Sequence, residues 1–158
     1  MRRVFADTLY WIATVKSSDP YEPGARKARQ GIGPCVIVTT DEVLGEFVTA
    51  FSKGGSKMRA RAVQTVRDIL DSPSVKVIVQ SRESFWHALE RFSKRPDKDY
   101  SLTDCSSMNA MDTEGIRDVL TYDHHFEQEG YNVLIRSVLS ERSRRSFGRA
   151  AAMTTLRV

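Results

Sequence analysis

Short β-branched runs alternate with longer segments of helical periodicity along most of this 158-residue chain. Apolar β-branched runs fill strands that are buried on both faces, and helices between them cover those faces. The alternation is therefore typical of repeated βαβ units around a mostly parallel sheet. This predicts an α/β fold with a central sheet of about five strands. The strands are predicted at residues 3–6, 35–39, 75–79, 119–122 and 132–135.

Helices are predicted in the segments between these strands, at residues 8–15, 41–52, 57–70, 84–92, 104–113 and 124–129. Two of them carry apolar stripes, which support the helix predictions. The stripes are Ala62, Val63, Val66, Ile69 and Leu70 in the first helix, and Phe85, Trp86, Leu89 and Phe92 in the second. Residues 17–34 contain three prolines and three glycines, which predicts a loop with a short helix inside.

The length suits one domain, and 41% hydrophobic with 28% charged residues excludes a disordered or fibrous chain. The net charge of +4 comes from the end of the chain, where residues 136–158 hold six Lys and Arg but one acid. We therefore expect a folded domain over residues 1–135 and a basic C-terminal extension over residues 136–158. Such an extension either contacts phosphates or forms a solvated helix end.

The chain has no apolar run close to the length that crosses a bilayer, and Asp7 interrupts the only stretch that resembles a signal sequence. We expect a cytoplasmic protein without a membrane contact. Cys35 and Cys105 lie far apart and outside any Cys/His ligand spacing. We expect both to be buried thiols and not disulfide or zinc partners.

Two acids directly follow predicted strands: Asp7 follows residues 3–6, and Asp123 follows residues 119–122. In an open parallel sheet the ligand crevice lies outside the carboxyl ends of the strands, so these two acids can meet there. Taken singly, each is also a common turn residue after a strand. The functional interpretation therefore depends on the whole set of acids.

Glu46 and Asp104 complete that set. Glu46 lies at the border of the apolar stripe of its helix, whereas Glu42 lies almost opposite and matches a capping box with Thr39. Asp104 opens a predicted helix, where an N-cap is the alternative role. The candidate site therefore consists of four carboxylates: Asp7, Glu46, Asp104 and Asp123.

Crowded carboxylates repel one another and bind protons unless a divalent cation neutralises them. Oxygen ligands with room for water and phosphate suit Mg²⁺ or Mn²⁺ better than Zn²⁺. Such a site supports phosphodiester hydrolysis, because the cation activates a water and stabilises the charge of the transition state. Basic residues around it would hold nucleic acid.

The residues around these acids resemble the PIN-domain ribonucleases, and among them the VapC-type toxins. The resemblance spans about residues 3–135, and its most specific part is an Asp-x-His-Phe stretch followed by a Gly-aromatic pair. The matching segments are Asp7-Thr8, Val43-Leu44-Gly45-Glu46, Ser101-Leu102-Thr103-Asp104-Cys105, Leu120-Thr121-Tyr122-Asp123-His124-His125-Phe126 and Gly130-Tyr131.

The resemblance implies a three-layer α/β/α domain and a metal-dependent endoribonuclease that uses Mg²⁺ or Mn²⁺. Asp7, Glu46, Asp104 and Asp123 would be its catalytic and metal-binding residues, with the hydroxyl of Thr121 or Thr103 holding a water beside them. VapC-like enzymes cut RNA, commonly tRNA or rRNA, are inhibited by a cognate antitoxin and usually form homodimers. We expect a toxin of a toxin–antitoxin pair on this basis.

Two alternatives remain open. A housekeeping RNA-processing nuclease would share the fold, and a PIN-like module could bind RNA or protein without cutting. The presence of all four acids argues against the second. His124 and His125 suggest a general base, but packing or phosphate contact is the expected role, because a metal-activated water needs no separate imidazole.

Overall fold

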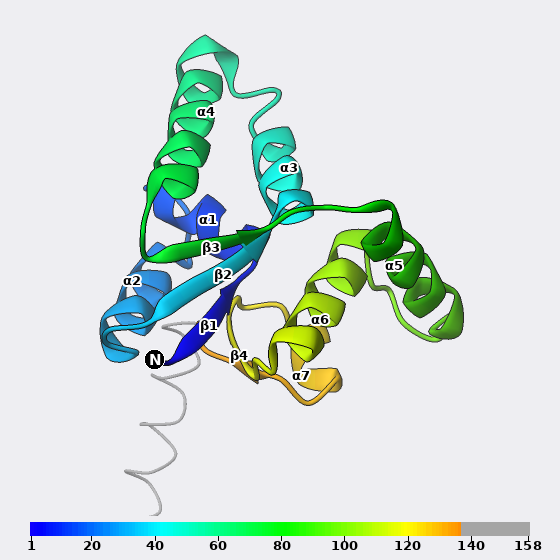
Figure 1. Cartoon of the computed structure of the whole chain (residues 1–158). Coiled ribbons are helices and arrows are strands. Elements are labelled where there is room, and N and C mark those ends of the chain that lie inside the picture. Colours follow the sequence, from blue (N-terminus) through cyan, green and yellow to red (C-terminus); the bar gives the residue numbers. More distant parts are fainter. Residues whose placement is uncertain (137–158) are drawn as a thin grey trace, which may run out of the picture.

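The computed structural model describes residues 1–136 as an α/β domain around one parallel sheet (Figure 1). The strand order is β3-β2-β1-β4-β5, and every neighbouring pair is parallel. The predicted fold class is thus confirmed, with strand ends shifted by a few residues at most. The strands are β1 (Arg3–Ala6), β2 (Val36–Thr40), β3 (Val75–Ile78), β4 (Asp118–Leu120) and β5 (Asn132–Val133).

The connections place helices on both faces of the sheet. The chain first moves from β1 outward to β3 and then returns to β4 and β5, and right-handed crossovers send these two halves to opposite faces. Helix α3 lies near the carboxyl ends of the strands and contacts both α1 and α6. The helices are α1 (Thr8–Val15), α2 (Glu22–Gly31), α3 (Asp41–Ala50), α4 (Gly55–Asp71), α5 (Arg82–Lys94), α6 (Leu102–Glu114) and α7 (His124–Gln128).

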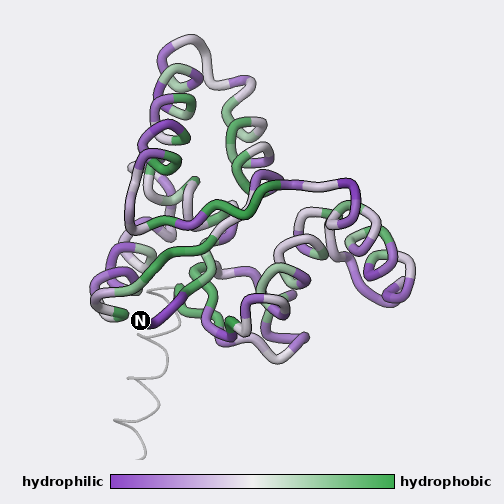
Figure 2. The backbone as a smooth tube through the Cα atoms, viewed as in Figure 1, coloured by the Kyte–Doolittle hydropathy of each residue, from purple (hydrophilic) through white to green (hydrophobic). Residues whose placement is uncertain are grey.

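The core is centred on β1 and β4, whose side chains are covered on both faces. Phe5 and Leu120 have no exposed surface, and Phe47 from α3 and Met108 from α6 pack into the same cluster. Both cysteines are buried and unpaired, as expected. Figure 2 shows the hydrophobic strands running through the centre of the domain. This packing fixes the carboxyl ends of the strands as a rigid platform.

The segment at residues 17–34 contains the predicted helix, α2, which is ten residues long and begins at Glu22. Pro23 lies in its first turn, where proline is favoured. The apolar stripes of α4 and α5 are only partly covered: Leu70 is 57% exposed and Trp86 is 57% exposed, with Val63 and Phe92 also at the surface. Both helices project from the sheet. Helical spacing therefore identifies the apolar face of each helix, but not how much of that face one copy of the chain buries.

No helix within residues 1–136 is long and apolar enough to cross a membrane. The basic C-terminal extension predicted at residues 136–158 lies outside the described residues, apart from Arg136.

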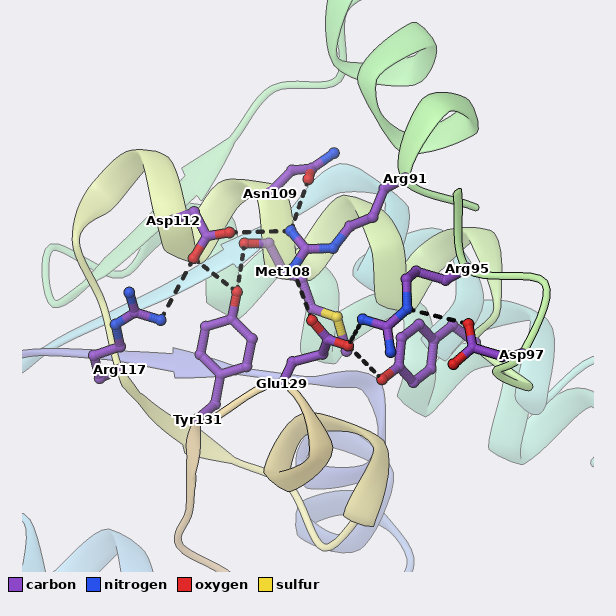
Figure 3. A network of polar contacts seen from close by, with 10 residues as sticks. Arg91, Arg95, Asp97, Met108, Asn109, Asp112, Arg117, Glu129 and Tyr131 are labelled. Carbon is purple, nitrogen blue, oxygen red and sulfur yellow. Dashed lines mark hydrogen bonds and ion pairs between the residues drawn. The ribbon is translucent and has the colours of Figure 1, made fainter. Parts of the chain in front are cut away.

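A polar network fastens α5 and the end of α7 onto α6 (Figure 3). Arg91 donates to Asp112 at 3.0 Å and pairs with Glu129 at 3.7 Å. Glu129 also accepts a hydrogen bond from the Tyr100 hydroxyl at 2.8 Å, and the Tyr131 hydroxyl donates to Asp112 at 2.8 Å. The carboxylates of Asp112 and Glu129 therefore join α5 to Tyr100 and Tyr131.

We predict that Glu129→Ala lowers the free energy of unfolding by about 2–4 kcal/mol, because it leaves the largely covered Tyr100 hydroxyl without a partner and removes one of the two carboxylates that pair with Arg91. Urea unfolding measures the change. Glu22→Ala is the matched control, since it breaks an exposed pair with Arg26 and should cost at most about 0.5 kcal/mol. Equal losses in both variants would show that the network does not stabilise the fold.

Candidate active site

Asp7 is held at the carboxyl end of β1 by a single donor. It is the N-cap residue of α1, yet its side chain makes no capping hydrogen bond. Its Oδ2 accepts a hydrogen bond from the Thr121 hydroxyl at 3.0 Å, whereas its Oδ1 is buried without a partner in the described part of the chain. The residue is only 3% exposed. A buried carboxylate oxygen without a donor is costly unless a cation neutralises it.

Thr121 links the ends of β1 and β4. It has no exposed surface, and its hydroxyl donates to Asp7 while accepting from the backbone N–H of Asp123 at 3.1 Å. One side chain thus holds the Asp7 carboxylate and the backbone of Asp123. The resemblance implied that Thr121 or Thr103 holds a water beside the acids. Thr121 instead donates directly to Asp7, and no hydrogen bond involves the Thr103 side chain within residues 1–136.

Asp123 caps α7. Its Oδ1 accepts from the backbone N–H of His125 at 2.9 Å, and its Oδ2 accepts no hydrogen bond from any residue that the structure describes. The side chain is 22% exposed. Asp123 therefore combines a capping role with a second oxygen that remains available to a ligand.

Glu46 reaches the site from the middle of α3. Its Oε2 accepts a short hydrogen bond from the Thr8 hydroxyl, which joins α3 to the first turn of α1. Sequence reasoning did not assign a role to Thr8, although the Asp-Thr pair was part of the resemblance. The capping box predicted between Thr39 and Glu42 is wrong: Thr40 caps α3 and accepts from Val43, so Glu42 does not stand at the third helical position.

Asp104 belongs to the first turn of α6 but is not its N-cap. Ser101 is the N-cap, and Asp104 completes a capping box in which its Oδ2 accepts from the Ser101 N–H at 2.8 Å. The Oδ1 of Asp104 accepts no hydrogen bond within residues 1–136. The capping alternative and the ligand role are therefore compatible, because they use different oxygens.

The four carboxylates influence one another electrostatically. Burial raises the pKa of Asp7 to about 7, and the charges of Asp104 and Glu46 add to the increase, whereas the nearby backbone N–H of Thr8 and the Thr121 hydroxyl act against it. Burial also raises the pKa of Asp104, with Asp123 and Glu46 as further causes, against hydrogen bonds from Ser101. Each acid thus lies within the field of at least one other, as expected for strand ends that converge.

Two histidines adjoin this cluster in different ways. His125 is largely covered, its Nδ1 lies 3.3 Å from Asp123 Oδ1 and 3.9 Å from Asp104 Oδ2, and its ring contacts Tyr100 edge to face. His124 is 70% exposed. Ligand atoms of Asp123, His124 and His125 come within 4.8 Å of one another, so nitrogen ligands are available beside the carboxylates.

No family model matches the chain. Among curated proteins, the chain is 27% identical over 128 residues to the 23S rRNA-specific endonuclease VapC20 of two Mycobacterium tuberculosis strains, across 81% of this chain and 95% of that protein. The crystal structure of M. tuberculosis VapC20, a toxin that cleaves the sarcin–ricin loop, superposes with a TM-score of 0.73 at 25% identity over the same shares.

In both sequence and fold the chain is similar to the VapC-type PIN-domain toxins. A nuclease of this type implies a divalent metal ion, and the donor set fits one. Among residues 1–136, each of the four carboxylates has one oxygen held by a hydrogen bond and one oxygen without any. The free oxygens are Asp7 Oδ1, Glu46 Oε1, Asp104 Oδ1 and Asp123 Oδ2. Carboxylate oxygens without other partners suit a hard cation such as Mg²⁺ or Mn²⁺.

The raised pKa of Asp7 predicts how the stability of this domain depends on pH in EDTA. The folded state favours protonated Asp7, so its contribution is present at low pH and is lost as pH rises from about 4 to about 7. One pKa unit corresponds to about 1.4 kcal/mol, so the loss amounts to a few kcal/mol.

Asp7→Asn mimics the protonated side chain and supplies the reference. We expect its advantage in unfolding free energy over the wild type to grow between pH 5 and pH 8 in EDTA, and to shrink when Mn²⁺ is added. Chemical denaturation at several pH values measures both. A pH-independent difference would show that Asp7 is already ionised throughout this range.

Proposed function

We propose that this chain is a divalent-metal-dependent endoribonuclease in which Asp7, Glu46, Asp104 and Asp123 hold the metal. The observation that carries the proposal is the pattern of half-satisfied carboxylates: one oxygen of each is fixed by the protein, and the other is free. Turn or cap residues with no further role would not need to converge, because their local hydrogen bonds are satisfied separately. Mg²⁺ and Mn²⁺ are the cations that this donor set favours.

The residues of the chain prepare the site before RNA arrives. Thr121, Thr8 and the Ser101 N–H orient Asp7, Glu46 and Asp104, so little rearrangement is required on binding. A bound divalent cation lowers the pKa of a coordinated water and offsets the charge that develops on the phosphate. His125 lies at the edge of the cluster, where its covered ring can contact a phosphate oxygen.

The substrate and partners follow from the VapC type. VapC20 is specific for 23S rRNA, and ribosomal RNA is therefore the first substrate that we propose for this chain. We further propose that a cognate antitoxin inhibits it and that two copies associate. The partly exposed apolar residues of α4 and α5 leave surface for such contacts.

We predict that Asp7→Asn lowers RNA cleavage at least about 100-fold in Mg²⁺ or Mn²⁺, since it removes one charged ligand from the metal site. EDTA should abolish cleavage by the wild type. Gel analysis of purified ribosomes and of total RNA measures both effects. Asp41→Asn is the matched control: Asp41 opens α3 and accepts from the Gln80 N–H outside the carboxylate set, so its cleavage should stay close to wild type. Cleavage by Asp7→Asn at the wild-type rate would contradict the site assignment.

Thr121 allows a separate test of how the carboxylates are oriented. Thr121→Val keeps the shape of the buried side chain but removes the hydroxyl between Asp7 and Asp123. We expect Mn²⁺ affinity, measured by calorimetric titration, to fall about 10- to 100-fold.

Thr39→Val is the control for this substitution, because Thr39 is equally buried and donates to the Ala6 carbonyl without touching a carboxylate. Its Mn²⁺ affinity should be unchanged even if its stability falls. Equal affinities in wild type and Thr121→Val would show that the hydroxyl does not position the metal ligands.

A further inference from the structure

A basic segment without any acid runs from the end of α3 through most of α4. Residues 47–67 contain five cations and no Asp or Glu, although the chain as a whole is nearly balanced. All five are exposed, and none forms an ion pair within residues 1–136. Figure 1 shows that this hairpin stands away from the sheet. The cations are Lys53, Lys57, Arg59, Arg61 and Arg67.

A groove lies beside this segment, between α1, the end of α3 and the start of α4. Its volume is about 620 Å³. Ile12, Phe51 and Met58 form part of its apolar lining, and the cationic side chains of Lys53 and Arg61 also line it. An apolar lining with cations beside it suits a ligand that combines flat rings with negative charge.

The groove adjoins the carboxylate site along two helices. Helix α1 begins at Thr8, which binds Glu46, and ends at Val15 in the groove lining. Helix α3 carries Glu46, and Ala50, four residues further on, lines the groove. At about 1.5 Å per residue, these positions are about 6 Å apart along the helix axis. That distance is comparable to the step between neighbouring nucleotides in an extended strand.

The negative charge of the carboxylate site explains why a basic surface beside it would help to bind RNA. The site contains four carboxylates, so a phosphate approaching it meets repulsion that one divalent cation only partly offsets. Attraction for the rest of the strand must come from cations outside the site that are not already paired. The basic segment supplies such cations, Lys53 and Arg61, in the groove whose lining begins one helical turn beyond Glu46.

We propose that this groove, which we call the α1–α4 groove, binds the RNA strand next to the cleaved phosphate, with Lys53 and Arg61 on its backbone phosphates and the apolar lining against a base. This inference rests on the proposed nuclease function and adds the surface that holds the substrate. An acidic protein segment is the competing occupant, and the experiment below separates the two.

The test measures binding of a fluorescein-labelled single-stranded 12-nucleotide RNA of mixed sequence by anisotropy, in EDTA, with full-length protein. In the Lys53→Ala/Arg61→Ala variant we expect at least about tenfold weaker binding at 0.1 M salt. The slope of log affinity against log salt should fall by about 1.4, since each lost phosphate contact on a single strand contributes about 0.7.

Arg82→Ala/Lys94→Ala is the matched control, because it removes the same charge from exposed positions on α5. Its affinity and salt slope should stay close to wild type. Every variant keeps the basic residues 136–158, so the difference between variants reports the groove. Equal losses in the two double variants would overturn the proposal, since they would indicate an effect of net charge alone.

Cleavage kinetics separate this inference from the proposed function. If Lys53→Ala/Arg61→Ala raises KM and leaves kcat near wild type, the groove binds substrate and the carboxylates do the chemistry. If that variant cleaves RNA with the wild-type KM, the proposal that the groove binds RNA is wrong, while the proposed nuclease function is unaffected. If the wild type does not cleave RNA but the variant still loses RNA binding, the proposed nuclease function is wrong, while the proposal that the groove binds RNA is supported.

A last arm addresses the competing occupant with a polyglutamate peptide of equal charge in place of RNA. If the Lys53→Ala/Arg61→Ala variant loses affinity for the peptide but keeps that for RNA, the groove recognises an acidic protein and the proposal is wrong. Loss for RNA that exceeds the loss for the peptide supports it.

Discussion

The repulsion among four carboxylates at one edge of the sheet is the constraint around which this fold is arranged. Parallel strands bring Asp7 and Asp123 to the same edge, and burial raises the pKa of Asp7 to about 7. The surrounding residues reduce this cost without removing it, because each acid receives a hydrogen bond on one oxygen only. A fold selected for stability alone would satisfy both oxygens or replace the acids. The remaining imbalance is the energy that a bound cation recovers.

The elements that carry the acids are fixed from the outside. Asp104 is near the start of α6, and the second half of that helix is tied to α5 and to Tyr131 through Asp112 and Arg91. Glu129, just after α7, joins the same network and also holds Tyr100, whose ring lies against His125. A polar network on the second half of α6 thus helps to position the groups near its first turn, although within residues 1–136 no hydrogen bond joins its members to the four carboxylates.

The positions of the acids were predictable and the resemblance pointed to Thr121, but nothing in the sequence indicated that Thr8 would orient Glu46. Asp7 and Asp123 follow buried strands, so the geometry of a parallel sheet brings them together whatever their distance in sequence. Hydroxyl donors such as Thr8 carry no periodic signal, since Thr is common in strands and first turns. Helical spacing likewise shows which apolar residues share a helix face, but not whether one copy of the chain covers that face. Trp86 is an example.

Opposite charges are divided between two neighbouring regions of this domain. The carboxylates form a site that repels phosphate until a cation is present, and the segment from residue 47 to residue 67 attracts phosphate at all times. If both sets of charges were mixed, they would pair with each other, as Arg91 and Glu129 do in the network on α6. Separation keeps the carboxylates free for a metal and the cations free for a strand. Because α1 and α3 border both regions, a strand held by the cations lies within reach of the acids without any movement of the sheet.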